Sequence, residues 1–137
     1  MIVNFNIVDF SALNYKGRHI DLHNNFDFVS SDYEIVSKRL VLTWKKSIGN
    51  WVKVDEFSKL TLIHSNVSFL NYNYDNNTLS SFDNCLSEIT FFPSTERTKN
   101  KEFIDQAKPK EDDDIIYSFV TDHFIRVGCE NILLIPE

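Results

Sequence analysis

The segment that most constrains this fold is Ile115–Ile135, with the sequence IIYSFVTDHFIRVGCENILLI. Two runs rich in β-branched and aromatic residues, Ile115–Thr121 and Phe124–Cys129, flank the polar pair Asp122–His123. A third apolar run follows at Ile132–Ile135. This order predicts an antiparallel hairpin that continues into a third strand, with an exposed turn between the first two strands.

Short alternating runs recur along the chain ahead of this hairpin. Apolar and polar residues alternate in Ile2–Asp9, Arg18–His23, Lys59–His64, Val67–Tyr74 and Ser87–Phe92. Such alternation is typical of strands that bury one face and wet the other. Helical periodicity is almost absent, so eight to ten short strands are expected. The sequence therefore predicts one all-β domain over residues 1–137, an antiparallel β-sandwich or a partly open barrel.

The segment Tyr33–Trp44 fits two interpretations. A period of two residues places Leu40, Leu42 and Trp44 on one face, whereas a helix aligns Tyr33, Val36 and Leu40 on one stripe. The β-branched residues in its second half favour the strand.

The inward positions of the expected strands define a predicted core in a chain of which 14% is aromatic. The members of this core are Phe5, Ile7, Ile20, Leu22, Leu40, Leu42, Leu60, Leu62, Phe69, Ile89, Phe91, Tyr117, Phe119, Ile125, Val127, Leu133 and Ile135. Two segments stay outside it. Ser94–Asp114, the longest polar stretch, is expected to be a loop with room for a short helix at Lys101–Ala107, and Trp51–Val54 is expected to be an irregular edge.

The chain has a net charge of −6, and the excess acid lies in its second half. Residues 1–64 hold 8 Lys and Arg against 7 Asp and Glu, whereas residues 65–137 hold 6 against 13. Binding of nucleic acid is disfavoured, because it needs a basic surface to neutralise phosphate. A basic protein suits this charge as a partner, although moderate net charge also keeps a small domain soluble.

The acidic run Glu111–Asp114 is the candidate surface for such a partner, through Glu111, Asp112, Asp113 and Asp114. We expect the run to repel itself and stay solvated. It lacks the alternating spacing and the glycine of an EF-hand loop, so calcium is a weaker interpretation.

A weak metal-site candidate lies in the segment Arg18–His23. On a strand, His19, Asp21 and His23 share one face, and two imidazoles with a carboxylate are ligands for a first-row metal. An ordinary solvated strand face, with Ile20 and Leu22 inside, explains the same pattern. We therefore expect no metal and no cofactor.

Four aromatic residues form the candidate site for stacking a sugar or another small ligand: Trp44, Trp51, Tyr72 and Tyr74. Tyr72 and Tyr74 alternate with asparagines that supply hydrogen-bond donors and acceptors. The competing interpretation is that these rings fill the core and its rim.

No GxSxG, HExxH, P-loop or GxGxxG motif occurs, so no enzymatic activity is expected. Cys85 and Cys129 form no CxxC pair, and Cys129 is expected to be a small buried hydrophobe. The sequence shows no secretory signal and no apolar run of the roughly 20 residues that a membrane helix requires. A cytoplasmic location is expected.

Three segments, Lys59–Tyr72, Leu86–Phe92 and Phe119–Ile135, resemble a pattern of small, mostly uncharacterised bacterial all-β proteins. Some proteins of this type are immunity partners of secreted polymorphic toxins. The resemblance covers core-strand residues in about half of the chain and carries no catalytic or binding motif. It implies a sandwich-like fold of unassigned role, for which toxin neutralisation is one option. Together with the net charge, this favours a non-enzymatic protein-binding domain that neutralises a basic toxin. Carbohydrate or small-ligand binding through surface aromatics is the alternative.

Overall fold

The computed structural model describes residues 1–73 and 84–137, which form twelve strands, one short α-helix and one 3-10 helix. In chain order the elements are β1 (Ile2–Val3), β2 (Asn6–Val8), β3 (Ala12–Tyr15), β4 (Arg18–Asp21), α1 (Leu22–Asn25), β5 (Phe26–Glu34), β6 (Arg39–Lys46), β7 (Lys59–Ser65), β8 (Phe69–Asn73), β9 (Leu86–Pro93), η1 (Ser94–Glu96), β10 (Asp113–Phe119), β11 (Phe124–Gly128) and β12 (Asn131–Pro136). The all-β prediction is confirmed, with twelve strands in the described residues where eight to ten were expected.

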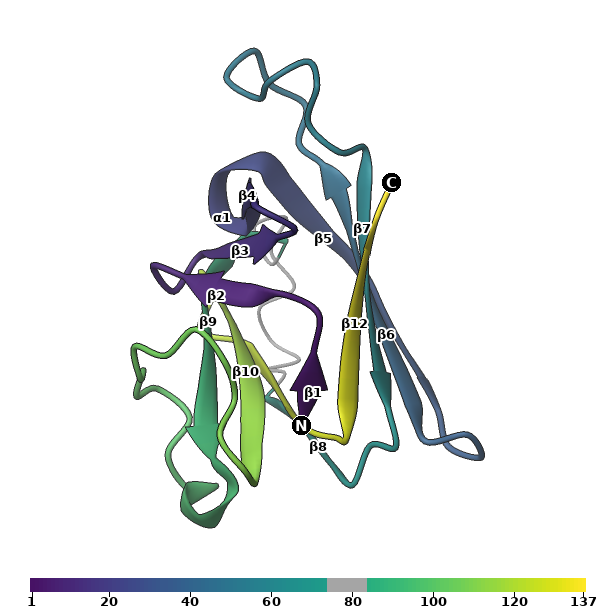
Figure 1. Cartoon of the computed structure of the whole chain (residues 1–137), viewed down its shortest axis with the longest axis vertical. Helices are drawn as coiled ribbons and strands as arrows, with labels where there is room; N and C mark the ends of the chain where they lie inside the picture. The colour runs from purple at the N-terminus through teal and green to yellow at the C-terminus, as the bar shows by residue number, and fades with distance from the viewer. Residues whose placement is uncertain (74–83) are drawn as a thin grey trace.

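The strands form three sheets (Figure 1). A five-stranded sheet has the order β1-β12-β7-β6-β5, a four-stranded sheet the order β8-β11-β10-β9, and a three-stranded sheet the order β2-β3-β4. Neighbouring strands are antiparallel apart from β1 and β12, which run parallel. The two smaller sheets both lie on one side of the five-stranded sheet, on the left in Figure 1. This arrangement is the predicted sandwich.

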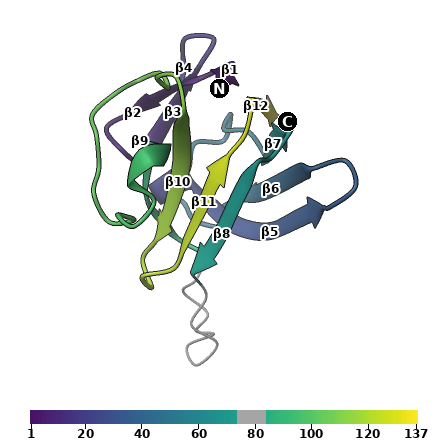
Figure 2. The same cartoon turned by 90° about the horizontal axis from the view of Figure 1, so that it is seen from below.

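The C-terminal hairpin forms as predicted, and its third strand changes sheets. Strands β10 and β11 pair with Tyr117 opposite Ile125, inside the four-stranded sheet that Figure 2 shows from below. Strand β12 then crosses to the five-stranded sheet and pairs with β7. The expectation of an exposed turn is wrong for His123, which is buried, whereas Asp122 is exposed with a positive φ of 65°.

The core joins side chains from all three sheets. Around Trp44, the ring centroid of Phe28 lies 5.1 Å away and that of Tyr117 lies 5.8 Å away. The strand interpretation of the segment around Trp44 is therefore confirmed, with Leu40 and Leu42 fully buried beside it, and the helical one is wrong.

Three predicted core residues depart from the prediction. Phe69 is partly buried, while Leu133 and Ile135 are exposed on β12, where Ile132 and Leu134 face the core instead. The expected strand Arg18–His23 ends at Asp21, because the Asp21 side chain accepts a hydrogen bond from the Asn24 amide and caps α1.

Two further segments differ from expectation. Residues 101–107 form no helix and follow η1 as irregular chain, tied to β9 where Thr90 Oγ1 accepts from the Ile104 amide at 3.2 Å. Trp51–Val54 is part of an irregular loop between β6 and β7, residues 47–58, rather than an edge strand.

Candidate functional site

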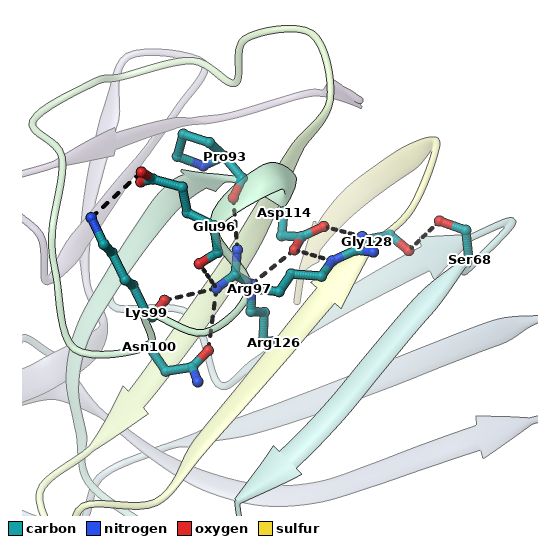
Figure 3. Close-up of polar contacts among 9 residues, drawn as sticks. All are labelled: Ser68, Pro93, Glu96, Arg97, Lys99, Asn100, Asp114, Arg126 and Gly128. Atoms are coloured by element: carbon teal, nitrogen blue, oxygen red, sulfur yellow. Dashed lines mark hydrogen bonds and ion pairs between the residues drawn. The ribbon is translucent and has the colours of Figure 1, made fainter.

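The acidic run ends in a buried ion cluster, which Figure 3 shows. Asp114, 1% exposed, accepts two hydrogen bonds from Arg97, from Nε to Oδ2 and from Nη2 to Oδ1, both 2.9 Å long. Arg126 donates a third, from Nε to Oδ2 at 2.8 Å. The guanidinium of Arg97 also stacks on the ring of Phe69, with its carbon 3.8 Å from the ring centroid. The pKa of Arg97 is raised, chiefly by its hydrogen bonds to Asp114.

Arg126 fastens the segment after β9 to the sheet. Its side chain is fully buried, and besides Asp114 it donates to the carbonyls of Pro93 at 2.9 Å and Lys99 at 2.8 Å. A further contact reaches Asn100 Oδ1 at 3.2 Å. A buried guanidinium needs such a set of acceptors, so this cluster stabilises the loop rather than presenting charge to a ligand.

The expectation of a solvated acidic run is therefore wrong for its second half. Asp113 is also buried, where its Oδ2 accepts from Gln106 at 2.5 Å and from the Lys110 amide at 2.8 Å. Only Glu111 and Asp112 are exposed to a partner. Binding of a partner at these two residues stays a prediction.

The three metal-ligand candidates do not form one cluster. His19 is exposed on β4, Asp21 is engaged as the cap of α1, and His23 lies on α1 with Nδ1 2.7 Å from the Leu86 carbonyl oxygen. No group of three potential ligand residues in the described ranges is placed to hold a metal ion.

The four ring candidates also do not form one stacking surface within the described residues. Trp44 is fully buried in the core, as the competing interpretation held. Tyr72 lies on β8, where its hydroxyl hydrogen bonds with Ser31, and Tyr74 lies outside the described residues. Trp51 is exposed on the loop 47–58.

The closest approach of a thiol to an imidazole is between Cys85 and His23, with Sγ 3.7 Å from Nδ1. A carbonyl only accepts, so the contact with Leu86 assigns the proton to Nδ1 and leaves no lone pair facing the thiol. Burial, and secondarily the charge of Asp27, raise the pKa of Cys85. This arrangement does not activate Cys85 as a nucleophile. Cys129, a free thiol that is partly buried, has its pKa raised to about 12, chiefly by burial.

The most distinctive surface lies on the outer face of the five-stranded sheet. Register places Val41 of β6, Ile63 of β7 and Leu133 of β12 side by side, and Ile135 follows Leu133 on the same face. Their inward neighbours along each strand are buried, so these four side chains point outward. Leu133 is 48% and Ile135 36% exposed, while Val41 and Ile63 are partly exposed. We refer to these four residues as the aliphatic strip.

Charged side chains border the aliphatic strip. On β5, which is the edge strand, Asp32 lies opposite Val41 and Glu34 lies opposite Arg39, so both carboxylates share the outer face. Both are exposed, and within the described residues their carboxylates accept hydrogen bonds from the nearby Ser30 and Ser37. At the other end of the strip, Lys59 pairs with Glu137 within the chain at 2.9 Å.

Two features of this site escaped the sequence prediction. In Ile132–Ile135 every residue is apolar, so alternation does not tell which residues face the core. A strand that is apolar on both faces is itself a sign of a second apolar surface. Arg126 is surrounded in sequence by apolar strand residues. A cation at such a position is buried and needs a carboxylate partner, so the sequence itself indicates an ion pair here. The acidic run was the place in the sequence to look for that partner.

No protein-family model matches the chain, and no curated protein or solved structure matches it significantly. Within the described residues, none of the helices is long and apolar enough to cross a membrane.

Proposed function

We propose that this protein is a non-enzymatic binding domain whose partner is a basic protein that packs on the outer face of the five-stranded sheet. The observation that carries the proposal is the aliphatic strip. Strands that need to bury only one face place polar residues on the other, whereas here one outward position of β6, one of β7 and two of β12 are aliphatic. Apolar residues gathered on an outer face are characteristic of interaction surfaces.

The dimensions of the sheet fit part of a protein interface. Five strands about 4.8 Å apart and seven residues at about 3.3 Å each give a face of roughly 19 Å by 23 Å. This flat area is about half of the roughly 800 Å² that each partner buries in a stable complex. The partner must therefore extend beyond the strip, onto the β5 edge or the loops that flank the sheet.

The charge of the surface favours a basic partner. Asp32 and Glu34 lie beside the strip and form no ion pair in the described part of the chain, where Arg39 lies opposite Glu34 on the same face. The chain as a whole carries −6. Complementary charge at the rim accelerates association and makes it sensitive to salt, while the apolar centre supplies most of the affinity. The complex is expected to form more slowly at high ionic strength.

Neutralisation of a basic toxin, the role suggested by the resemblance, is a specific form of this proposal. It requires that binding on the sheet face blocks the activity of the partner. The two free thiols, Cys85 and Cys129, fit the reducing conditions of the cytoplasm, which is the compartment we propose.

The test is affinity capture from the source cells with the native chain and two variants. The double variant Leu133→Ser/Ile135→Ser removes the exposed half of the strip, while Val36→Ser removes a 94% exposed aliphatic side chain from the turn between β5 and β6. A basic protein retained by the native chain and by Val36→Ser, and lost with the double variant, supports the proposal. Equal retention by all three chains, or enrichment of no protein, contradicts it.

A further inference from the structure

Trp51 is held in one orientation although it is exposed. Its Nε1 donates to the Asn24 carbonyl at 3.0 Å, and the six-membered part of the indole lies against Gly49. A Cβ at Gly49 would lie only 2.2 Å from a ring carbon, so glycine is required for the ring to occupy this place. The side chain nevertheless remains 64% exposed. A ring fixed at two points with most of its surface free is prepared for contact with a ligand.

The loop that carries Trp51 is tied to the body of the protein. Lys46 Nζ donates to the Lys53 carbonyl at 2.7 Å, and the Ser47 amide donates to the Asn25 carbonyl at 2.9 Å. Val52, next to Trp51, is buried. Because these contacts already order the loop, a ligand that binds to Trp51 does not incur the entropic cost of ordering it.

Trp51 forms one wall of an open pocket of about 500 Å³. The described residues that line it are His23, Asn24, Asp27, Ser47, Ile48, Trp51 and Cys85, which include one carboxylate and no lysine or arginine. Within the described chain, the Asp27 carboxylate has no hydrogen-bond or ion-pair partner, and Lys45, its cross-strand neighbour on β6, forms no ion pair with it. The negative charge of Asp27 acts on the pocket lining, since after burial it is the second cause that raises the pKa of Cys85.

We propose that this pocket binds an organic cation, a guanidinium or an alkylammonium group, which stacks on the indole of Trp51 and is neutralised by Asp27. Tryptophan is the aromatic side chain that attracts cations most strongly, through the negative face of its ring. The unpaired carboxylate supplies the opposite charge, and burial of part of the ligand in the pocket strengthens both contacts. A neutral ligand of the same shape gains neither.

Two sources supply such a group: a free small molecule, or an arginine or lysine side chain of a protein. The pocket shares no residue with the aliphatic strip, so cation binding here goes beyond the proposed function, whether the cation is a small molecule or a protein side chain. A basic partner on the sheet face that also inserts an arginine here would join the two surfaces.

The experiment follows the Trp51 indole N–H resonance, assigned with Trp51→Phe, during titration with N-acetyl-arginine amide. N-acetyl-citrulline amide is the matched probe, because it has the same shape and no charge. The arginine probe is expected to shift the Trp51 signal in a saturable way and to leave the signal of buried Trp44 in place. Asp27→Asn in this titration, and Trp51→Leu in a calorimetric titration with the same arginine probe, are each expected to lower the affinity about threefold to tenfold.

The control Asp105→Asn removes an exposed carboxylate that lines neither the pocket nor the sheet face, and it should leave the affinity unchanged. Equal shifts with the citrulline probe, or no saturable shift with the arginine probe, overturn the inference. Tighter binding of agmatine than of an arginine-containing peptide supports a small-molecule source, and the reverse supports a protein source. Leu133→Ser/Ile135→Ser should not affect this titration, so the pocket and the sheet face are tested separately.

Discussion

Replacement of Asp114 by asparagine is the sharpest test of how this fold is held together. The substitution keeps the size of the side chain and removes its charge. Asp114 is the only carboxylate in contact with the fully buried Arg126, whose other acceptors in the described structure are neutral. An asparagine amide also presents a donor in place of one of the two oxygens that accept from Arg97 and Arg126.

The expected loss of unfolding free energy is about 3–5 kcal/mol, since breaking one side of a buried ion pair leaves an uncompensated charge. This loss is a large fraction of the roughly 5–15 kcal/mol that stabilises a typical domain. The matched control is Asp112→Asn, two residues away on the exposed part of the run, where φ is 65°. Asparagine tolerates that conformation, so the control should change stability by less than about 0.5 kcal/mol.

Urea unfolding followed by circular dichroism measures both variants, and similar slopes with denaturant show that the same folded state is being compared. A loss below about 1 kcal/mol for Asp114→Asn would refute the account of the cluster. The apolar triple replacement Asp114→Leu/Arg97→Met/Arg126→Met is expected to lose much less than Asp114→Asn, because it leaves no charge buried.

Two further predictions concern His64 and β12. Burial lowers the pKa of His64 from 6.5 to about 4, so the native ring stays neutral while the unfolded chain takes up a proton below about pH 6.5. Stability should therefore fall as pH drops from about 6.5 toward 4, by up to about 3 kcal/mol, and urea unfolding of His64→Gln should show a flatter dependence in this window. On β12, Leu134→Ala should lower the free energy of unfolding by about 2–5 kcal/mol and Leu133→Ala by less than about 1 kcal/mol, because Leu134 is buried and Leu133 is exposed. Thermal unfolding measures both, and similar losses of stability would show that the two faces of β12 are misassigned.

Alternation predicted the fold well wherever one face of a strand is polar. Leu60 and Leu62 of the predicted core are both buried on β7, and His64, which alternation places on the same face, is buried beside them. It failed in β12, where both faces are apolar, and the wrong pair was assigned to the core. The failure has a physical reason. Leu133 and Ile135, which remove the alternation from β12, are exposed because they belong to the aliphatic strip.

The candidate sites were less predictable, because they depend on contacts between distant segments. Asp21 fitted the strand pattern, yet as a helix cap it ends β4 and directs His23 to the carbonyl of Leu86, 63 residues away. The burial of Asp114 depends on ion pairs with two arginines, and the pairing of β10 with β11 brings one of them, Arg126, next to it. Trp51 was identified as a ring candidate, but its contacts with Gly49 and Asn24 appear only in three dimensions.

The affinity of the captured basic protein for this domain shows whether the aliphatic strip is the surface that binds it. Calorimetric titration compares the native chain with Leu133→Ser/Ile135→Ser and with Val36→Ser, after circular dichroism shows that each variant is folded. The account predicts at least about tenfold weaker binding for the double variant, because each leucine or isoleucine that becomes fully buried contributes on the order of 1 kcal/mol, and unchanged binding for Val36→Ser. Equal affinity for all three chains would contradict the claim that the aliphatic strip is the binding surface.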